Sequence, residues 1–318
     1  MPFTKFTNLD FDQIKESIKD YLRANSNFTG FDFEGSNFSV LIDTLAYNTY
    51  ITAFNSNMVV NESFLDSATL RENVVSLARN IGYVPRSRNS AKATISFSVD
   101  VIGTSTESIT LEKGLVCKGS VENSSYLFSN VEDISVQTQN IDFSNVNGDL
   151  INARRATFSN IEVSQGTFLT KKFTYDGSLS QKFILDNSFI DTSSIRVYVD
   201  EVEYKLVDNI INVDGQSTIF LIQEIQDEKY ELLFGDGLIG KKLQNGDIIT
   251  VNYMITDGEK SNGAAFFTFA GRLLDSNKNP VSPSPFALTT VSKAQNGSNI
   301  ETIDSIKYFA PKIYSAQN

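Results

Sequence analysis

The sequence predicts an α+β fold, with an N-terminal helical bundle region followed by a mainly antiparallel β domain. Three observations predict this fold class. Up to about residue 90, apolar residues recur at the three- and four-residue intervals of amphipathic helices. From about residue 92 to residue 271 they alternate with polar residues, as in the run 93–99, and β-branched residues are abundant. Asp-Gly and Asn-Gly pairs between the expected strands favour tight hairpins, and therefore antiparallel pairing.

The same changes of pattern divide the chain into three predicted segments. Residues 1–90 are expected to form an N-terminal helical assembly domain, and residues 91–274 a mainly β domain. Residues 275–318 are expected to hold a linker and the start of a C-terminal helical segment whose remainder is absent. A chain of 318 residues that is 41% hydrophobic can bury a substantial core, so a globular protein is expected.

Three helices are expected in the first segment. The first begins after Asp10, a good N-cap residue with Gln13 three positions further on. The second is expected over residues 36–58 and the third over residues 66–80. Gly82 follows the third helix at the position where a left-handed glycine commonly closes a helix.

The second helix is predicted to have two apolar faces instead of one. At 100° per residue, one face carries Phe38, Leu41, Ile42 and Leu45. The opposite face carries the interface candidates Val40, Tyr47, Ile51, Phe54 and Met58. Two explanations remain open: the neighbouring helices of this chain cover both faces, or helices of other subunits cover the second face in an intersubunit bundle.

In the β segment, strands are expected over residues 195–199, 219–222, 230–234 and 248–253. The segment Gly235, Asp236 and Gly237 is predicted to be a structural turn that holds a hairpin. A cation-binding loop is the weaker interpretation, because the segment lacks the alternating acidic ligands of a calcium site.

A short helix is predicted near the C-terminal end of the sequence. Residues 275–285 are polar and contain prolines, which indicates a linker. Ser298 and Glu301 then have the spacing of a capping box, which predicts a helix that reaches about Phe309 and stops at Pro311.

Small charged clusters have simple interpretations. Arg86, Arg88 and Lys92 could hold an anion or an acidic patch of a partner, as could Arg154 with Arg155, but solvated charge explains both clusters. Asp32 and Glu34 could be paired carboxylates of a glycosidase. Negative charge at the start of the second helix explains that pair better.

Composition argues against most enzyme chemistry. The chain contains no histidine, so the usual general base, metal ligand and nucleophile partner are missing. Cys117 is the only cysteine, which fits a reducing cytoplasmic compartment. The net charge of −11 disfavours nucleic acid and anionic lipid surfaces, and the apolar runs are too short to span a bilayer. We predict no catalytic, cofactor-binding or metal-ligating residue.

Several blocks resemble a known family. They are residues 31–36, 45–48, 61–64, 70–75, 80–85, 234–237, 245–247 and 257–263. Together they resemble the N-terminal half of the baseplate wedge subunit of T-even-like contractile-tailed phages, and the wider baseplate J-like group. The resemblance is weakest between about residues 120 and 181.

The resemblance implies a structural protein of the virion tail baseplate, assembled in the host cytoplasm. Such a subunit pairs through N-terminal helices with a second copy of itself and with other wedge subunits, and it meets sheath-proximal baseplate proteins. Six wedges surround a hub, and the ring relays a change of shape that leads to sheath contraction. No nucleic acid, membrane, small-molecule substrate or cofactor is expected. Two alternatives are a tail-associated polysaccharide-degrading enzyme and a receptor-binding adhesin.

Overall fold

The computed structural model describes residues 10–24, 32–33, 35, 37–102, 106–144, 150–207, 213–282 and 288–313, without the side chains of residues 143, 144, 150 and 151. The chain divides into two compact units: residues 1–85 with residues 302–318, and residues 86–301. The first unit is helical and the second is built of mainly antiparallel sheets, which confirms the predicted fold class.

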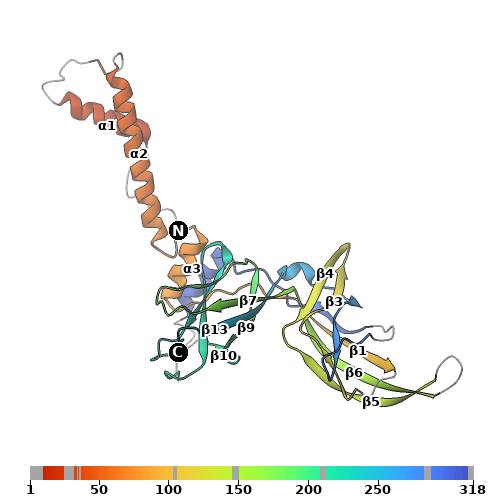
Figure 1. Ribbon diagram of the computed structural model, residues 1–318. Coiled ribbons are helices and arrows are strands. Elements are labelled where there is room, and N and C mark those ends of the chain that lie inside the picture. The colour runs from red at the N-terminus through yellow and green to blue at the C-terminus, as the bar shows by residue number, and fades with distance from the viewer. Residues whose placement is uncertain are drawn as a thin grey trace. The chain divides into compact units, whose positions relative to one another are not determined.

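The described residues of the helical unit form four α-helices (Figure 1): α1 (Phe11–Arg23), α2 (Phe38–Glu62), α3 (Arg71–Asn80) and α4 (Ile303–Phe309). The predicted N-cap is confirmed, because Asp10 Oδ1 accepts hydrogen bonds from the backbone N–H groups of Asp12 and Gln13, at 3.0 and 3.1 Å. The predicted start of the second helix at residue 36 lies outside the described residues. Gly82 has a φ of 82°, so it closes α3 as predicted.

Helix α3 begins five residues later than predicted, because Glu62 organises the corner that leads into it. The Glu62 carboxylate accepts hydrogen bonds from Thr69 N (2.7 Å), Thr69 Oγ1 (2.6 Å), Leu70 N (3.2 Å) and Asn73 Nδ2 (2.8 Å). Burial alone would raise the pKa of Glu62, but these hydrogen bonds outweigh it and lower the pKa to about 2. The last residue of α2 therefore caps α3.

This cap predicts a pH-dependent loss of stability. The contribution of the Glu62 charge is complete above its usual pKa of 4.5 and disappears as the pH falls through about 2. We expect Glu62→Gln to lower the free energy of unfolding by about 1–2 kcal/mol at pH 7. The difference from the unsubstituted chain should shrink between pH 4.5 and 2.

Urea unfolding followed by circular dichroism measures the effect. Glu72→Gln, at an exposed carboxyl in the first turn of α3, is the matched control and should change little. An equal loss in both variants would contradict the capping role of Glu62.

The core of the helical unit lies between α3 and α4. Its buried residues are Ala68, Val74, Val75, Ala78, Ile306 and Ala310. Residues from opposite ends of the sequence therefore share one core. The end of α4 at Phe309 agrees with prediction, and Pro311 lies in the single 3₁₀ turn Ala310–Lys312 that follows.

The predicted capping box of α4 is wrong. The N-cap is Thr302, whose Oγ1 accepts a hydrogen bond from Ser305 N at 3.3 Å. Glu301 lies before the helix and its carboxylate accepts a hydrogen bond from Arg86 N instead, because a backbone donor from a distant segment is close by. Ser298 takes part in an isolated bridge with Asn89.

The second unit contains two sheets. The nine-stranded sheet comprises β1 (Lys92–Ile102), β2 (Ser108–Leu111), β3 (Gly114–Val121), β4 (Ser124–Asn130), β5 (Ile134–Ser144), β6 (Leu150–Gln165), β14 (Phe266–Phe269), β15 (Leu273–Asp275) and β16 (Thr289–Gln295). Its main path is β14-β3-β4-β6-β5-β2-β15, with β1 paired to both β6 and β16. Burial alternates along β1, as its period-two pattern predicts.

The seven-stranded sheet comprises β7 (Thr167–Thr174), β8 (Phe183–Leu185), β9 (Ile190–Val199), β10 (Val202–Leu206), β11 (Ile219–Glu224), β12 (Tyr230–Phe234) and β13 (Ile248–Ile255). Its order is β7-β13-β9-β10-β11-β12-β8, and among the strand pairs that the structure describes in this sheet only β10–β11 is parallel. The four strands predicted individually correspond to β9, β11, β12 and β13. Two short 3₁₀ turns, Gln226–Glu228 and Gly258–Ser261, complete the described elements of the unit.

Each sheet has its own core. Phe128 and Phe158 are among the largest fully buried side chains of the nine-stranded sheet, and Phe220 and Leu232 of the seven-stranded sheet. Strand β16 extends the nine-stranded sheet beyond the boundary predicted at residue 274, because it pairs with β1. The predicted linker at 275–285 therefore does not separate the β unit from the residues that follow it.

The Gly235–Gly237 segment forms a turn, but the predicted hairpin is wrong. Asp236 Oδ1 accepts hydrogen bonds from Leu238 N and Ile239 N, at 2.8 and 2.9 Å, and these bonds lower the pKa of Asp236. However, β12 pairs with β11 and β8, while β13 pairs with β7 and β9. The segment therefore begins a crossover between strands that are not neighbours.

Candidate interface on the N-terminal helices

Helix α2 is long and almost free of charge. Among its 25 residues, only Asp43 and Glu62 are charged. Glu62 caps α3, and the Asp43 carboxylate lies 2.6 Å from Lys15 Nζ on α1. A solvent-facing helix ordinarily carries charged residues along its outer face, and the stretch 44–61 has none.

The hydroxyl side chains of α2 bond to the helix itself. Four of them, Thr44, Thr49, Thr52 and Ser56, donate to the carbonyl oxygen four residues earlier at 2.8–2.9 Å, and Ser63, the C-cap residue, does the same at 2.8 Å. Such bonds satisfy the hydroxyl groups without an external partner. The helix surface is consequently less polar than its sequence suggests.

The structure places the five predicted interface residues on an exposed face. The exposed fractions of Val40, Tyr47 and Phe54 are 68%, 60% and 49%, Met58 is also exposed, and Ile51 is partly buried. Spacings of four and seven residues place all five on one side of the helix. Within the described residues, α1 and α3 leave that face open.

Helix α1 lies against the other apolar face of α2, beside the end farther from α3 (Figure 1). Ile42 and Ala46 are fully buried there. An open groove of about 540 Å³ runs between the two helices. Its apolar lining consists of Ile14, Ile18, Tyr21, Leu22, Phe38, Leu41, Ile42 and Leu45.

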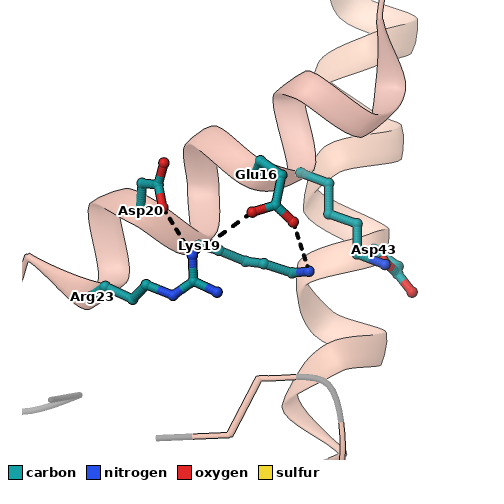
Figure 2. A network of polar contacts seen from close by, with 6 residues as sticks. Glu16, Lys19, Asp20, Arg23 and Asp43 are labelled. Atoms are coloured by element: carbon teal, nitrogen blue, oxygen red, sulfur yellow. Dashed lines mark hydrogen bonds and ion pairs between the residues drawn. The ribbon is translucent and has the colours of Figure 1, made fainter. Parts of the chain in front are cut away.

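Charged residues hold α1 in place (Figure 2). The Lys15–Asp43 ion pair joins α1 to α2 at 2.6 Å. Along α1, Lys19 Nζ donates to Glu16 at 3.0 Å and Arg23 Nη1 donates to Asp20 at 2.9 Å. Lys19 is only 3% exposed, although lysine is almost never buried unless it is paired. These charged side chains of α1 thus form ion pairs either with α2 or within α1.

The basic clusters considered from sequence are engaged within the chain. The Arg88 guanidinium lies 4.2 Å from the centre of the Phe189 ring and donates to Asn299 Oδ1 at 3.2 Å. Arg155 donates two hydrogen bonds to Asp100, at 2.6 and 2.8 Å, and this contact lowers the pKa of Asp100. Arg88 and Arg155 therefore have partners within the chain, although the Arg155 side chain is still 48% exposed.

Cys117 is buried within the chain, and Asp32 is hydrogen-bonded within it. Burial raises the pKa of the Cys117 thiol to about 12, so it is a poor nucleophile. Asp32 Oδ1 accepts a hydrogen bond from Gly35 N at 3.1 Å, while Glu34 lies outside the described residues. Within the described ranges, no three His, Cys, Asp or Glu side chains form a group that could hold a metal ion. None of the described helices is long and apolar enough to cross a membrane.

A helical unit with an open apolar face, joined to a unit of two mainly antiparallel sheets, defines an α+β protein of two compact units. Residues 10–83 match the family model "Baseplate wedge protein gp6-like, helical domain", and residues 167–260 match "Bacteriophage baseplate wedge protein gp6, third domain". The chain is also similar to baseplate wedge protein gp6 of Enterobacteria phage T4, with 29% identity over 95% of this chain and 46% of the relative.

The chain belongs to the gp6-like baseplate wedge family, which confirms the resemblance found in the sequence. It spans about half the length of the curated relative. The matched helical domain contains α1, α2, α3 and the exposed face of α2, and the matched third domain covers the seven-stranded sheet.

Proposed function

We propose that this chain is a non-catalytic structural subunit of a phage contractile-tail baseplate wedge. In this proposal residues 1–90 act as the assembly domain, and the apolar face of α2 packs against a second copy of the chain and against other wedge subunits. The observation that carries the proposal is the exposed face of α2 formed by Val40, Tyr47, Ile51, Phe54 and Met58.

The charge pattern favours a second copy as one occupant of this face. Two copies of a charge-free helix face can approach without like-charge repulsion, and a self-complementary patch is what a twofold dimer requires. A helix supplied by another wedge subunit would need the same uncharged character, because an unpaired charge in the contact would be costly to bury. The face therefore selects apolar helices.

The wider role follows from the family. The relative is named as a baseplate wedge protein, and we propose that this chain likewise occupies the virion tail baseplate after assembly in the host cytoplasm. There it would help form the ring around the hub, contact sheath-proximal proteins and relay the change of shape that precedes sheath contraction. The net charge of −11 makes nucleic acid an unfavourable partner.

The test replaces Tyr47, Ile51 and Phe54 together by serine. We expect a chain that retains its circular dichroism spectrum and melting temperature, because Tyr47 and Phe54 are exposed and Ile51 is only partly buried. Self-association and co-purification with co-expressed neighbouring baseplate proteins should be lost. Light scattering after size-exclusion chromatography gives the particle masses.

A matched control replaces the exposed polar residues Asn48, Thr52 and Asn55 of the same helix by serine. This control should assemble like the unsubstituted chain. The proposal fails if the face variant keeps its partners, or if it simply unfolds, since unfolding would show that the face stabilises the isolated chain.

A further inference from the structure

The two edges of the seven-stranded sheet lie beside each other. Strands β7 and β8 stand at opposite ends of the sheet order, and among the described strand pairs β7 pairs only with β13 and β8 only with β12. Yet the rings of Phe173 on β7 and Phe183 on β8 meet edge to face, with 5.6 Å between their centres. Lys171 Nζ on β7 donates to the carbonyl oxygen of Ile184 on β8 at 3.1 Å. The sheet therefore curls until its ends meet, as in a barrel, and side chains bridge the seam between β7 and β8.

Lys171 occupies an unusual position for a lysine. Alternate residues of a strand share one face, so Lys171 lies on the same side of β7 as Leu169 and Phe173, which pack against the core of this sheet. Lys172 lies on the opposite side and is exposed. The Lys171 side chain is only 28% exposed, and a partly buried ammonium group costs free energy unless it is paired. Inward-pointing charges on edge strands are one means by which proteins keep sheet edges from pairing with other chains.

Contacts across the seam and within β7 compensate the Lys171 charge. Besides its hydrogen bond to the Ile184 carbonyl oxygen, Lys171 forms an ion pair with Asp186, the residue that follows β8. Lys171 Nζ also lies 5.1 Å from the centre of the Phe173 ring. The hydrogen bond from Lys171 holds the pKa of Asp186 below its usual value. An edge strand leaves alternate carbonyl groups without a partner in its own sheet, and Lys171 satisfies the one at Ile184.

We propose that Lys171 is a clasp that closes the seven-stranded sheet into a barrel and keeps its two edges from pairing with strands of other chains. The Ile184 carbonyl oxygen is an acceptor that the backbone N–H of an added strand would need, and Lys171 occupies it. An added strand would also have to displace the Lys171–Asp186 ion pair. The clasp lies within the β unit and does not depend on the proposed baseplate function, so the two can fail separately.

The experiment measures amide hydrogen exchange by mass spectrometry in the full chain. Lys171→Met keeps a long apolar side chain and removes the charge. We expect residues 167–174 and 183–185 to exchange roughly tenfold faster than in the unsubstituted chain, because the seam opens while the rest of the sheet stays folded. Lys172→Met, on the exposed side of the same strand, is the matched control and should leave exchange unchanged.

A peptide tests whether the opened edge accepts another strand. A fluorescein-labelled peptide with the sequence of residues 167–174 should bind Lys171→Met, with a rise in fluorescence anisotropy, and should bind neither the unsubstituted chain nor Lys172→Met. If Lys171→Met does not fold, Asp186→Asn weakens the clasp at a side chain that is 73% exposed, and exchange at the seam should rise about threefold.

Three results would overturn the proposal. One is unchanged exchange at the seam in the folded clasp variants. Another is exchange that accelerates equally across the whole sheet, since Lys171 would then only stabilise the fold. The third is a peptide that binds Lys171→Met no better than it binds the unsubstituted chain.

Discussion

Gly166→Ala is expected to destabilise the β unit by about 1–3 kcal/mol more than a glycine substitution that meets only backbone strain. Gly166 lies between Gln165, the last residue of β6, and Thr167, the first residue of β7, so no linker separates the two sheets. Its φ is 147°, and an added Cβ would lie 2.4 Å from the carbonyl oxygen of Ile255. That oxygen belongs to the backbone of β13 and cannot rotate away.

The neighbouring contacts make the effect larger. Gln165 is 3% exposed, and its side chain makes three hydrogen bonds: Oε1 accepts from Thr256 Oγ1 at 2.7 Å and from Asp257 N at 2.9 Å, and Nε2 donates to Asp257 Oδ2 at 2.9 Å. A displacement of Gly166 would move Gln165 and leave buried polar groups without partners, at a cost of about 1–3 kcal/mol each.

Gly114→Ala is the matched control for this prediction. Gly114 has a φ of 104°, and nothing lies within 4 Å of the position its Cβ would take. We expect Gly114→Ala to lower the free energy of unfolding by about 1–3 kcal/mol, which is the cost of the unfavourable backbone conformation alone. Denaturant unfolding followed by far-ultraviolet circular dichroism suits a chain without tryptophan. Equal losses in the two variants would show that the close approach to Ile255 does not matter.

The sequence predicted helix ends and strand alternation correctly, because interactions between residues close together in the chain determine these features. Asp10 can act as an N-cap through groups two and three residues away, and Gly82 closes α3 through its own φ. The alternation in β1 depends only on which residues of one strand face a core. The two apolar faces of α2 also follow from its sequence alone, since they require nothing but helical geometry.

The features that sequence reasoning missed all involve distant partners. Ser298 and Glu301 had the spacing of a capping box, but Arg86 offered Glu301 a backbone donor 215 residues away in sequence. Glu62 ends α2 and carried no signal that it would cap another helix. The turn at Asp236 was recognisable, whereas the pairing of β12 with β8 and β11 was not, because turn residues do not specify strand order.

In the candidate interface, too, the features set by nearby residues were predictable and those set by distant partners were not. Helical periodicity identified Val40, Tyr47, Ile51, Phe54 and Met58 as one face, but it could not decide whether α1 or α3 would cover them. The structure places α1 on the opposite side, where the Lys15–Asp43 ion pair holds it. Charge spacing along two separate helices gives no indication of that pair, because it depends on how the helices pack.

The last prediction compares two glycines of the same crossover loop, Gly235 and Gly246. A Cβ on Gly235 would lie 2.2 Å from the backbone carbonyl carbon and oxygen of Gly240, although φ of Gly235 is not in the left-handed region. Gly246 has a φ of 97°, but its Cβ would meet nothing within 4 Å. Backbone preference alone would therefore rank Gly246→Ala as the more damaging change.

We expect the opposite order. Gly235→Ala should cost roughly 3 kcal/mol or more, because it forces backbone against backbone and disrupts the bond from Gly237 N to Gly240 O, which measures 3.0 Å. Gly246→Ala should cost about 1–2 kcal/mol. Denaturant unfolding of both variants provides the comparison, and a larger loss for Gly246→Ala would contradict the prediction. The expected order would mean that close packing against Gly240, and not the demands of a tight turn, requires glycine at position 235.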